Sequence, residues 1–229
     1  MNKYYIYGIH AVLAALQNDK RIVHMVYTNQ RNFDRYRNII SMHKYMIIKD
    51  FSHFQLNRHQ NFIAHVDRLR YQQVNMLGLN EIETVIVLDN VTDTFNIGSI
   101  IRTAVNLNAK YMIVMKRHGV HSENASIVKA AAGMFEKINY IPVVNIVNTI
   151  KFLKEKGFWI MGLSSYAHNS IDSVTRIGKR IAIVIGAEDK GIRSLVQKNL
   201  DVSIKIPISG ESLNASNAAA IALFALRNK

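Results

Sequence analysis

Hydrophobic and polar residues alternate along this chain with two different periods. Short aliphatic, β-branched runs predict buried strands, and stretches with apolar residues every three or four positions predict helices. In the last two thirds we expect strands at 84–88, 111–115, 138–144, 158–163, 180–185 and 202–206, and helices ending at 108 and covering 122–135, 145–156 and 214–226, with a short one after 191. Alternating strands and helices predict a largely parallel sheet.

The first third has the same mixed character on a smaller scale. Helices are expected at 8–16 and 32–43, and strands at 22–27, 45–49 and 61–66. The periodicity then weakens from 68 to 83. We therefore predict an α/β class with a small unit at 1–70, a linker at 71–82 and a larger unit at 83–229.

The closing helix carries almost no polar face between Ala218 and Leu226. A helix that is apolar all round must be covered on both sides. Burial inside one subunit and burial in a dimer interface fit this pattern equally well.

The net charge of the chain indicates which kind of molecule the protein binds. The 229 residues include 29 Lys and Arg against 16 Asp and Glu, a net charge of +13, while 49% are hydrophobic. A folded, strongly basic chain usually meets a polyanion such as RNA, although general basicity without a specific partner is the alternative.

The sequence disfavours disulfides, metal sites, export and membrane insertion. The chain has no cysteine, which excludes disulfides and thiolate metal sites and fits a reducing compartment, so we expect a cytoplasmic protein. The nine histidines show no metal-ligand spacing, and we predict no metal. The apolar stretch at 9–16 is too short for a signal sequence or a membrane span, so we expect neither export nor membrane insertion.

Three loops at expected strand ends carry the candidate chemistry, because open α/β sheets bind ligands at the carboxyl ends of their strands. After Gly186-x-x-x-x-Gly191 come Ile192 and Arg193, where a phosphate loop needs Lys and Ser or Thr. No strand runs into a Gly-x-Gly-x-x-Gly fingerprint either. Ordinary nucleotide cradles are therefore absent.

In chain order the three loops carry Asn96-x-Gly98-x-x-x-Arg102-x-Ala104, Gly186-x-Glu188-x-x-Gly191, and Ile206-Pro207 followed by Ser212-Leu213-Asn214-x-Ser216. Taken together, they resemble the motifs of the SpoU-type RNA ribose 2′-O-methyltransferases of the trefoil-knot (SPOUT) superfamily. Two departures are Thr94, where the family often has proline, and a Gly210-to-Asn214 loop shorter than in most relatives.

The resemblance implies a small N-terminal α/β substrate-binding domain followed by a mostly parallel-sheet α/β trefoil-knot domain. It implies S-adenosylmethionine as methyl donor, held by Gly186, Ile206 and Leu213. The chain looks most like the ribosomal-RNA guanosine 2′-O-methyltransferases. A transfer-RNA enzyme is the second alternative, and an inactive RNA-binding relative is the third.

The same resemblance assigns roles to side chains and a homodimeric assembly to the protein. Arg102 would activate the ribose hydroxyl or stabilise its developing negative charge. The expected positioning residues are Asn96, Glu188, Ser212 and Asn214. We expect Arg102 to turn back toward the strand ends, because it lies about one turn beyond Gly98.

Overall fold

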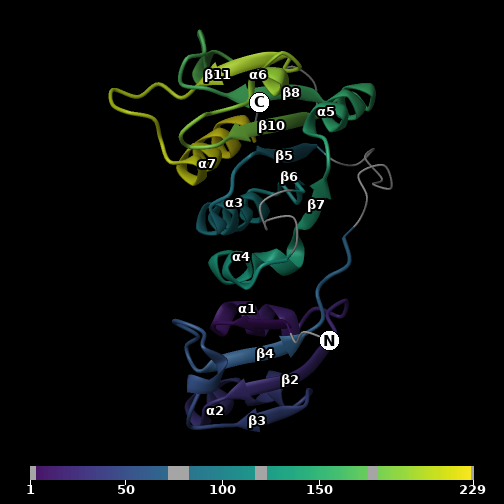
Figure 1. Ribbon diagram of the computed structural model, residues 1–229, viewed down its shortest axis with the longest axis vertical. Coiled ribbons are helices and arrows are strands. Elements are labelled where there is room, and N and C mark those ends of the chain that lie inside the picture. Colours follow the sequence, from purple (N-terminus) through teal and green to yellow (C-terminus); the bar gives the residue numbers. More distant parts are fainter. Residues whose placement is uncertain (1–3, 72–82, 117–122, 175–179, 228–229) are drawn as a thin grey trace.

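The chain forms two α/β units, each built on its own sheet (Figure 1). The structure is a computed structural model that describes residues 4–71, 83–116, 123–174 and 180–227. The expected linker at 71–82 therefore lies, apart from Tyr71, outside the described residues.

The N-terminal unit has a mixed four-stranded sheet in the order β1-β4-β2-β3. Its elements are β1 (Tyr4–Tyr7), α1 (Ile9–Leu16), β2 (Val23–Thr28), α2 (Gln30–Ile40), β3 (Tyr45–Ile47), the 3₁₀ turn η1 (Ser52–Phe54) and β4 (Phe62–Val66). β4 runs antiparallel to β1 and β2, whereas β3 is parallel to β2. The sequence pattern missed β1, although its Tyr-Tyr-Ile-Tyr run suits a strand.

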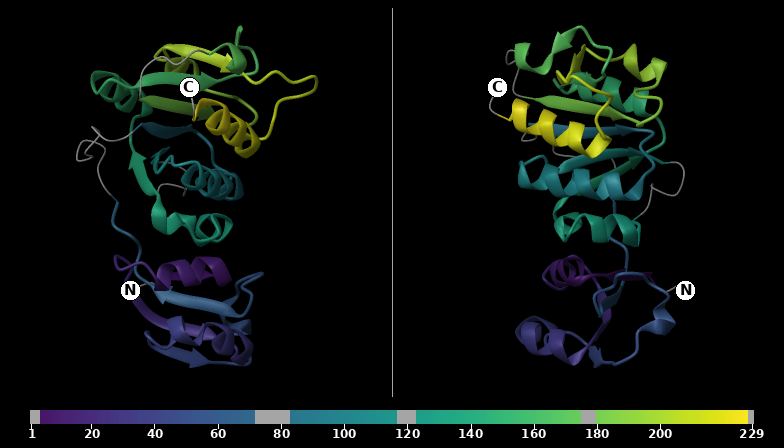
Figure 2. Two further views of the ribbon diagram at one scale, coloured as in Figure 1. Left: turned by 180° about the vertical axis from the view of Figure 1, so that it is seen from behind. Right: turned by 90° about the vertical axis from the view of Figure 1, so that its left-hand side faces the viewer.

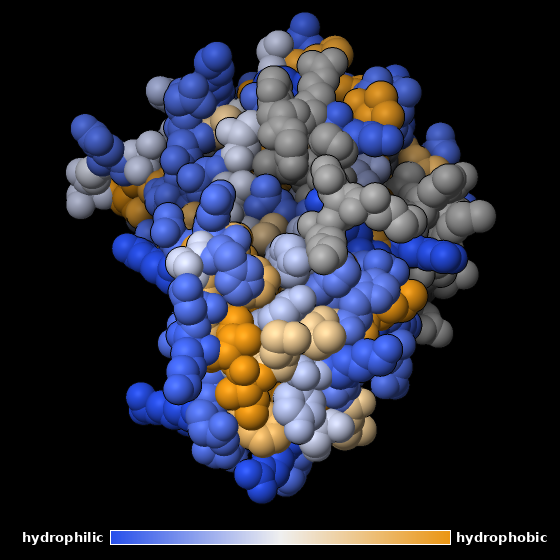
Figure 3. Space-filling model, turned by 60° about the horizontal axis from the view of Figure 1, so that its bottom comes forward, coloured by the Kyte–Doolittle hydropathy of each residue, from blue (hydrophilic) through white to orange (hydrophobic). Residues whose placement is uncertain are grey.

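The outer edge of this unit is partly apolar. All three residues of β3 are exposed, and Met42 beside it is 80% exposed. Figure 3 brings this end of the molecule forward and shows hydrophobic side chains gathered among polar ones.

The C-terminal unit has a seven-stranded sheet, and every pair of neighbouring strands in it is parallel. The order β7-β6-β5-β10-β8-β11-β9 places a late strand, β10, in the middle of the sheet. The strands are β5 (Thr84–Asp89), β6 (Tyr111–Met115), β7 (Asn139–Val143), β8 (Trp159–Leu163), β9 (Asn169–Ser170), β10 (Ile181–Gly186) and β11 (Val202–Lys205). The predicted α/β class is confirmed.

Helices cover both faces of the large sheet (Figure 2). In β5, Val85 and Val87 belong to the core beneath α5 and α6, while Ile86 and Leu88 belong to the core shared with α3, α4 and α7. Burial on both faces explains why these strands are continuously apolar. The helices are α3 (Thr94–Asn106), α4 (Ala125–Ala130), η4 (Met134–Lys137), α5 (Ile146–Glu155), η5 (Ile171–Ser173), α6 (Ser194–Gln197) and α7 (Ala215–Leu226).

The single helix expected at 122–135 is in fact divided into α4 and η4. The chain turns at Ala132 (φ 49°) and Gly133 (φ 88°), both left-handed. A side chain at Gly133 would collide with the carbonyl of His10 and the methyl of Ala14 in α1. Close contact with the other unit, which no local pattern reveals, therefore ends the helix.

The closing helix α7 is covered on one side only. Ala219, Ala222 and Leu223 are buried against the core, but Ile221 is 40% and Phe224 58% exposed. Within the described chain no helix is both long and apolar enough to cross a membrane.

The two units are joined by a buried group of charged side chains, Arg21, Glu123 and Glu136, which we call the interunit ion cluster. The Arg21 guanidinium lies 2.7 Å from Glu123 Oε1 and 2.5 Å from Glu136 Oε1. Asn18 Nδ2 donates to the other Glu136 oxygen at 2.6 Å. Around this cluster α1 contacts α4 and η4 (Figure 2), so the units meet through a packed interface.

Candidate active site

The three motif loops lie at one edge of the large sheet. β5 and β10 are parallel neighbours in register, so their last residues, Asp89 and Gly186, stand side by side. β11 runs in the same direction and leads into the long loop before α7, which projects from the left of Figure 1. Carboxyl ends of neighbouring parallel strands are where open α/β sheets bind ligands.

One residue from each motif meets at this edge, and we call Asn96, Glu188 and Asn214 the active-site cluster. Asn96 Nδ2 donates to Glu188 Oε1 at 2.8 Å, and Asn214 Nδ2 donates to Asn96 Oδ1 at 3.0 Å. Asn214 Nδ2 also donates to Glu188 Oε1. The structure thus brings together three of the residues that the sequence assigned to substrate positioning.

Helix starts hold the two asparagines in place. Asp93 is the N-cap of α3, and its carboxylate accepts from the Asn96 N–H at 2.7 Å. Asn214 is the N-cap of α7, and its Oδ1 accepts from the Ser216 N–H at 2.9 Å. Such caps satisfy free backbone donors, so local structure fixes the backbone of Asn96 and the side chain of Asn214. The Glu188 carboxylate also lies near the N-terminus of α7, where a negative charge is stabilised.

Gly98 and Gly186 are required by close packing. A methyl group at Gly98 would collide with Ala130 and the carbonyl of Ile127, so the glycine lets α4 cross the first turn of α3. A methyl group at Gly186 would collide with the backbone of Gly191, which folds back through paired hydrogen bonds with Ala187 at 2.8 and 3.1 Å. Gly191 itself has φ 62°.

An ion pair between a buried carboxylate and a partly exposed arginine anchors the second motif loop, and sequence reasoning missed it. Asp89, fully buried at the end of β5, accepts from Arg193 Nε at 2.7 Å and from the Arg193 N–H at 2.9 Å. The available signal was an aspartate ending an apolar strand, since a buried carboxylate needs a donor partner.

The expected cofactor residues lie around the same edge. Gly186, Ile206 and Leu213 are each half-buried, and Ser212 is exposed on the loop before α7. Main-chain groups of 207–213 make no hydrogen bond with other described residues, and Ile208 is 43% exposed nearby. Free main-chain donors and acceptors next to aliphatic side chains fit the adenine, ribose and methionine parts of S-adenosylmethionine.

Arg102 is exposed on α3, and its turn toward the strand ends stays a prediction. It lies six residues beyond Asn96, and at about 100° per residue this places it away from the buried side of α3. Its side chain is exposed and forms no hydrogen bond or ion pair with the active-site cluster. It shares the exposed face of α3 with Phe95, which is 69% exposed.

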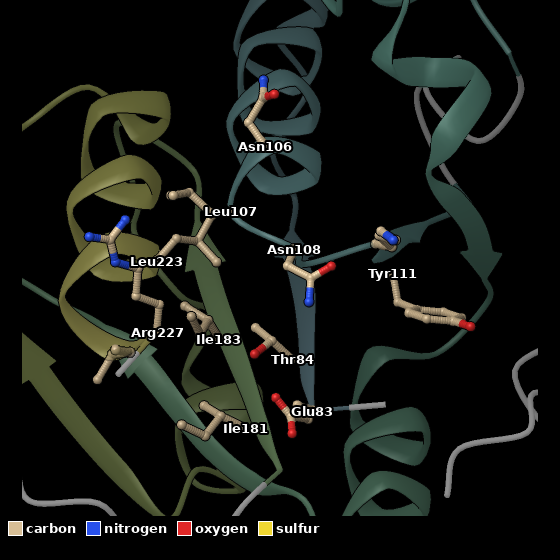
Figure 4. Close-up of a pocket in the computed structure, with 12 residues that line it drawn as sticks. Glu83, Thr84, Asn106, Leu107, Asn108, Tyr111, Ile181, Ile183, Leu223 and Arg227 are labelled. Atoms are coloured by element: carbon tan, nitrogen blue, oxygen red, sulfur yellow. The ribbon is translucent and has the colours of Figure 1, made fainter. Parts of the chain in front are cut away.

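A cavity of about 700 Å³ lies at the opposite edge of the sheet (Figure 4). Its walls include Glu83, Thr84 and Ile181 at the amino ends of β5 and β10, with Leu223 of α7. Because none of the motif residues lines it, size alone does not identify the site. No cluster of three or more metal-ligating side chains occurs in the described part of the chain.

Two family models match the chain. Residues 83–224 match the SpoU rRNA Methylase family, and residues 5–49 match the RNA 2′-O ribose methyltransferase substrate-binding family. The two matches fall on the two structural units.

Curated relatives align over nearly the whole chain. The 23S rRNA (guanosine-2′-O-)-methyltransferase RlmB of Nitrosomonas europaea is 34% identical, covering 96% of this chain and 89% of that protein. The RlmB of Vibrio cholerae is also 34% identical, with 98% and 96% covered. An uncharacterised tRNA/rRNA methyltransferase of Synechocystis is 34% identical over 96% of this chain, which spans only 61% of that longer relative.

Solved structures share the fold at lower identity. The SpoU methyltransferase AviRb of Streptomyces viridochromogenes, in complex with AdoMet, has a TM-score of 0.82 at 19% identity, covering 99% of this chain and 89% of that one. An AdoMet-bound rRNA methyltransferase of Sinorhizobium meliloti has a TM-score of 0.80 at 19% identity, with 99% and 87% covered.

Proposed function

The chain belongs to the SpoU rRNA methylase family, and from this premise we propose that it methylates the ribose 2′-hydroxyl of a guanosine in large-subunit ribosomal RNA. The methyl donor is S-adenosylmethionine. The observation that carries the proposal is the active-site cluster, in which one residue of each motif meets at a single sheet edge. An inactive relative would have no need to keep all three.

Cofactor binding falls to the second and third motif loops. Gly186 and Leu213 present main-chain groups, and the half-buried Ile206 offers an apolar contact. Bound S-adenosylmethionine supplies a methyl group on a positively charged sulfur, and S-adenosylhomocysteine is the by-product. The ion pair between Asp89 and Arg193 holds the second loop in shape.

The active-site cluster positions the acceptor ribose. Asn96 is only 5% exposed and is fixed on both sides, whereas Glu188 and Asn214 are exposed and can face a ligand. Holding an acceptor oxygen in line with the transferred group removes much of the entropic barrier. Ser212, on the same loop as Leu213, adds a hydroxyl for the RNA.

Arg102 acts on the charge that develops at the ribose oxygen. A guanidinium presents a planar set of N–H donors, so it orients a phosphate or stabilises an oxyanion through hydrogen bonds. Arg102 is exposed on α3, so another surface must contact it to hold the guanidinium beside the ribose oxygen.

A second copy of the chain provides that surface. The exposed face of α3 carries Phe95 and Arg102, and α3 packs against α7, which exposes Ile221 and Phe224. Exposed apolar side chains gathered on adjacent helices indicate an interaction surface. In a two-fold dimer this surface of each subunit would be covered by the same surface of the other. A homodimer therefore buries Arg102 beside the motif loops.

The test is transfer of labelled methyl to RNA transcripts. Large-subunit ribosomal RNA, transfer RNA and a DNA copy of the ribosomal sequence are incubated with labelled S-adenosylmethionine, and labelled nucleosides are identified by mass spectrometry. We expect 2′-O-methylguanosine in the ribosomal transcript and nothing in DNA, which lacks the acceptor hydroxyl. Labelled methyl in a base, or in DNA, would overturn the proposal. Labelled methyl in transfer RNA alone would show that transfer RNA, and not ribosomal RNA, is the substrate.

A further inference from the structure

A crevice of about 430 Å³ lies where the two units meet, apart from the active-site cluster. Its walls come from Tyr7 and Ala11 in the first unit, from Arg58 before β4, and from Lys129 and Ala132 at α4. We propose that this crevice, the interunit pocket, binds an unpaired nucleotide of the RNA, with the phosphate at the two cations and the base on the apolar wall. The proposal rests on the proposed function, because that function supplies RNA as the ligand.

The wall of the interunit pocket suits a nucleobase. The Tyr7 ring and the methyl groups of Ala11 and Ala132 are apolar, and no carboxylate is among the described residues that line the pocket. Proteins recognise unpaired RNA by packing bases against aromatic and apolar side chains. The volume is within the range of small-ligand sites.

Two cations line this pocket, and neither forms an ion pair with a described acidic side chain. Lys129 Nζ donates to the carbonyls of Asn57 at 3.2 Å and Arg58 at 2.5 Å, and lies 4.7 Å from the centre of the Tyr7 ring. Burial, and then the charge of Arg58, lowers the pKa of Lys129. Arg58 is exposed and forms no ion pair with any described Asp or Glu. A phosphate placed between them would relieve this repulsion through charge-assisted hydrogen bonds.

The loop that carries Arg58 is preorganised. Arg58, Gln60 and Asn61 have left-handed φ values of 56°, 57° and 52°, which side-chain-bearing residues adopt rarely. Asn32 Nδ2 holds the carbonyls of Gln60 at 2.9 Å and Asn61 at 3.2 Å, while Gln60 Oε1 accepts from the Ile9 N–H at 3.0 Å. Backbone strain sustained in this way is concentrated at ligand sites.

Helix α4 connects the interunit pocket with the active site. Lys129 and Ala132 face the pocket, while Ile127 and Ala130 pack on Gly98 in the first turn of α3, the turn that carries Asn96. Packed helices lie about 8–10 Å apart. A nucleotide in the pocket is therefore about one helix width from the turn that positions the acceptor ribose, so both can belong to one RNA segment.

Affinity for RNA tests the phosphate contact. Binding of a fluorescein-labelled single-stranded oligoribonucleotide of about 12 nucleotides is followed by anisotropy over a range of salt. We expect Arg58→Ala to weaken binding about tenfold and to lower the log–log salt slope by roughly 0.7. Arg31→Ala removes the same charge from the exposed side of α2 and should change neither. Equal effects of the two variants would overturn the proposal.

Photocrosslinking tests the base contact in the unaltered protein. An oligoribonucleotide of the same length, with 4-thiouridine at successive positions, should give adducts on the peptides that contain Tyr7 or Lys129. Tyr7→Leu should lose the adduct on the protein residue at position 7 and should weaken RNA binding, whereas Tyr7→Phe should retain affinity for RNA. Adducts found only on other surfaces would overturn the proposal.

These measurements separate the interunit pocket from the proposed function. Adducts in the pocket without methyl transfer would support the pocket and contradict the enzymatic activity. Methyl transfer at the normal rate by Arg58→Ala, with an unchanged salt slope, would contradict the pocket and leave the activity intact.

Discussion

The interunit ion cluster joins distant parts of the chain around the Arg21 guanidinium, and the active-site cluster does so around the Glu188 carboxylate, but the two differ in burial. The side chains of Arg21 and Glu123 are 0% exposed and that of Glu136 is 3% exposed. In the active-site cluster Asn96 is buried, whereas Glu188 and Asn214 are exposed. A fully enclosed network can only hold the fold together, while an exposed one keeps polar atoms available to a ligand.

The difference in burial predicts whether a mutation lowers the stability of the fold or the activity of the site. Removing one partner of an enclosed ion pair leaves an uncompensated buried charge and lowers stability. Removing an exposed group lets water replace it, so stability changes little, and the expected loss is in the positioning of the ligand. Four substitutions test this contrast, in order of decreasing effect.

Arg21→Ala should have the largest effect. It leaves Glu123 and Glu136 buried without a cation, so we expect the free energy of unfolding to fall by about 3–5 kcal/mol, measured by urea denaturation. The control is Arg37→Ala, which breaks an exposed pair with Asp34 and should cost under about 1 kcal/mol. Similar losses of unfolding free energy in both variants would show that burial does not make the Arg21 pairs more important to stability than the exposed pair.

Glu188→Ala should affect catalysis rather than folding. Asn96 and Asn214 both donate to Glu188 Oε1, and loosening them should lower the methylation rate about a hundredfold, measured in single turnover. Glu188→Gln keeps an acceptor oxygen and should retain most activity. Asp189→Ala, at the exposed next position, should behave like the unaltered protein. An inactive Glu188→Gln would mean that the charge, and not the hydrogen bonds, is required.

Phe224→Ala tests the exposed face of α7. If this face forms the homodimer, deleting a large central side chain should weaken dimerisation by about 2 kcal/mol, or roughly thirtyfold, measured by sedimentation. The control is Tyr166→Ala, which removes a 92% exposed ring on the loop after β8. A dimer unaffected by Phe224→Ala would place the interface elsewhere.

Asp89→Asn should have the smallest of the four effects. The amide oxygen can still accept from Arg193, but the charge is lost and the second motif loop loosens. We expect affinity for S-adenosylmethionine to fall about tenfold by calorimetry. Asp201→Asn alters another strand-end aspartate, paired with Lys154, and should leave cofactor affinity unchanged. Unaltered affinity in Asp89→Asn would show that the ion pair does not shape the cofactor site.

Local patterns determined much of the fold and the family. The strand predicted at 111–115 is β6 with the same bounds, and the helix predicted at 145–156 is α5, Ile146–Glu155. These elements were predictable because an apolar period and an N-cap residue act over one or two turns. The family resemblance is confirmed by the family model that matches residues 83–224. It could be recognised from sequence because glycines and capping asparagines at strand-to-helix turns are also local requirements.

Tertiary structure alone decided which distant residues meet. Arg21 and Glu123 are 102 positions apart, and Asp89 and Arg193 are 104 apart. The choice of a buried ion partner depends on which segments the folded chain packs together, and no sequence period encodes it. The break at Gly133 has the same origin, since α1 approaches the backbone there. Sequence therefore specified the elements and the motif residues, and packing between the two units specified the interunit ion cluster and the interunit pocket.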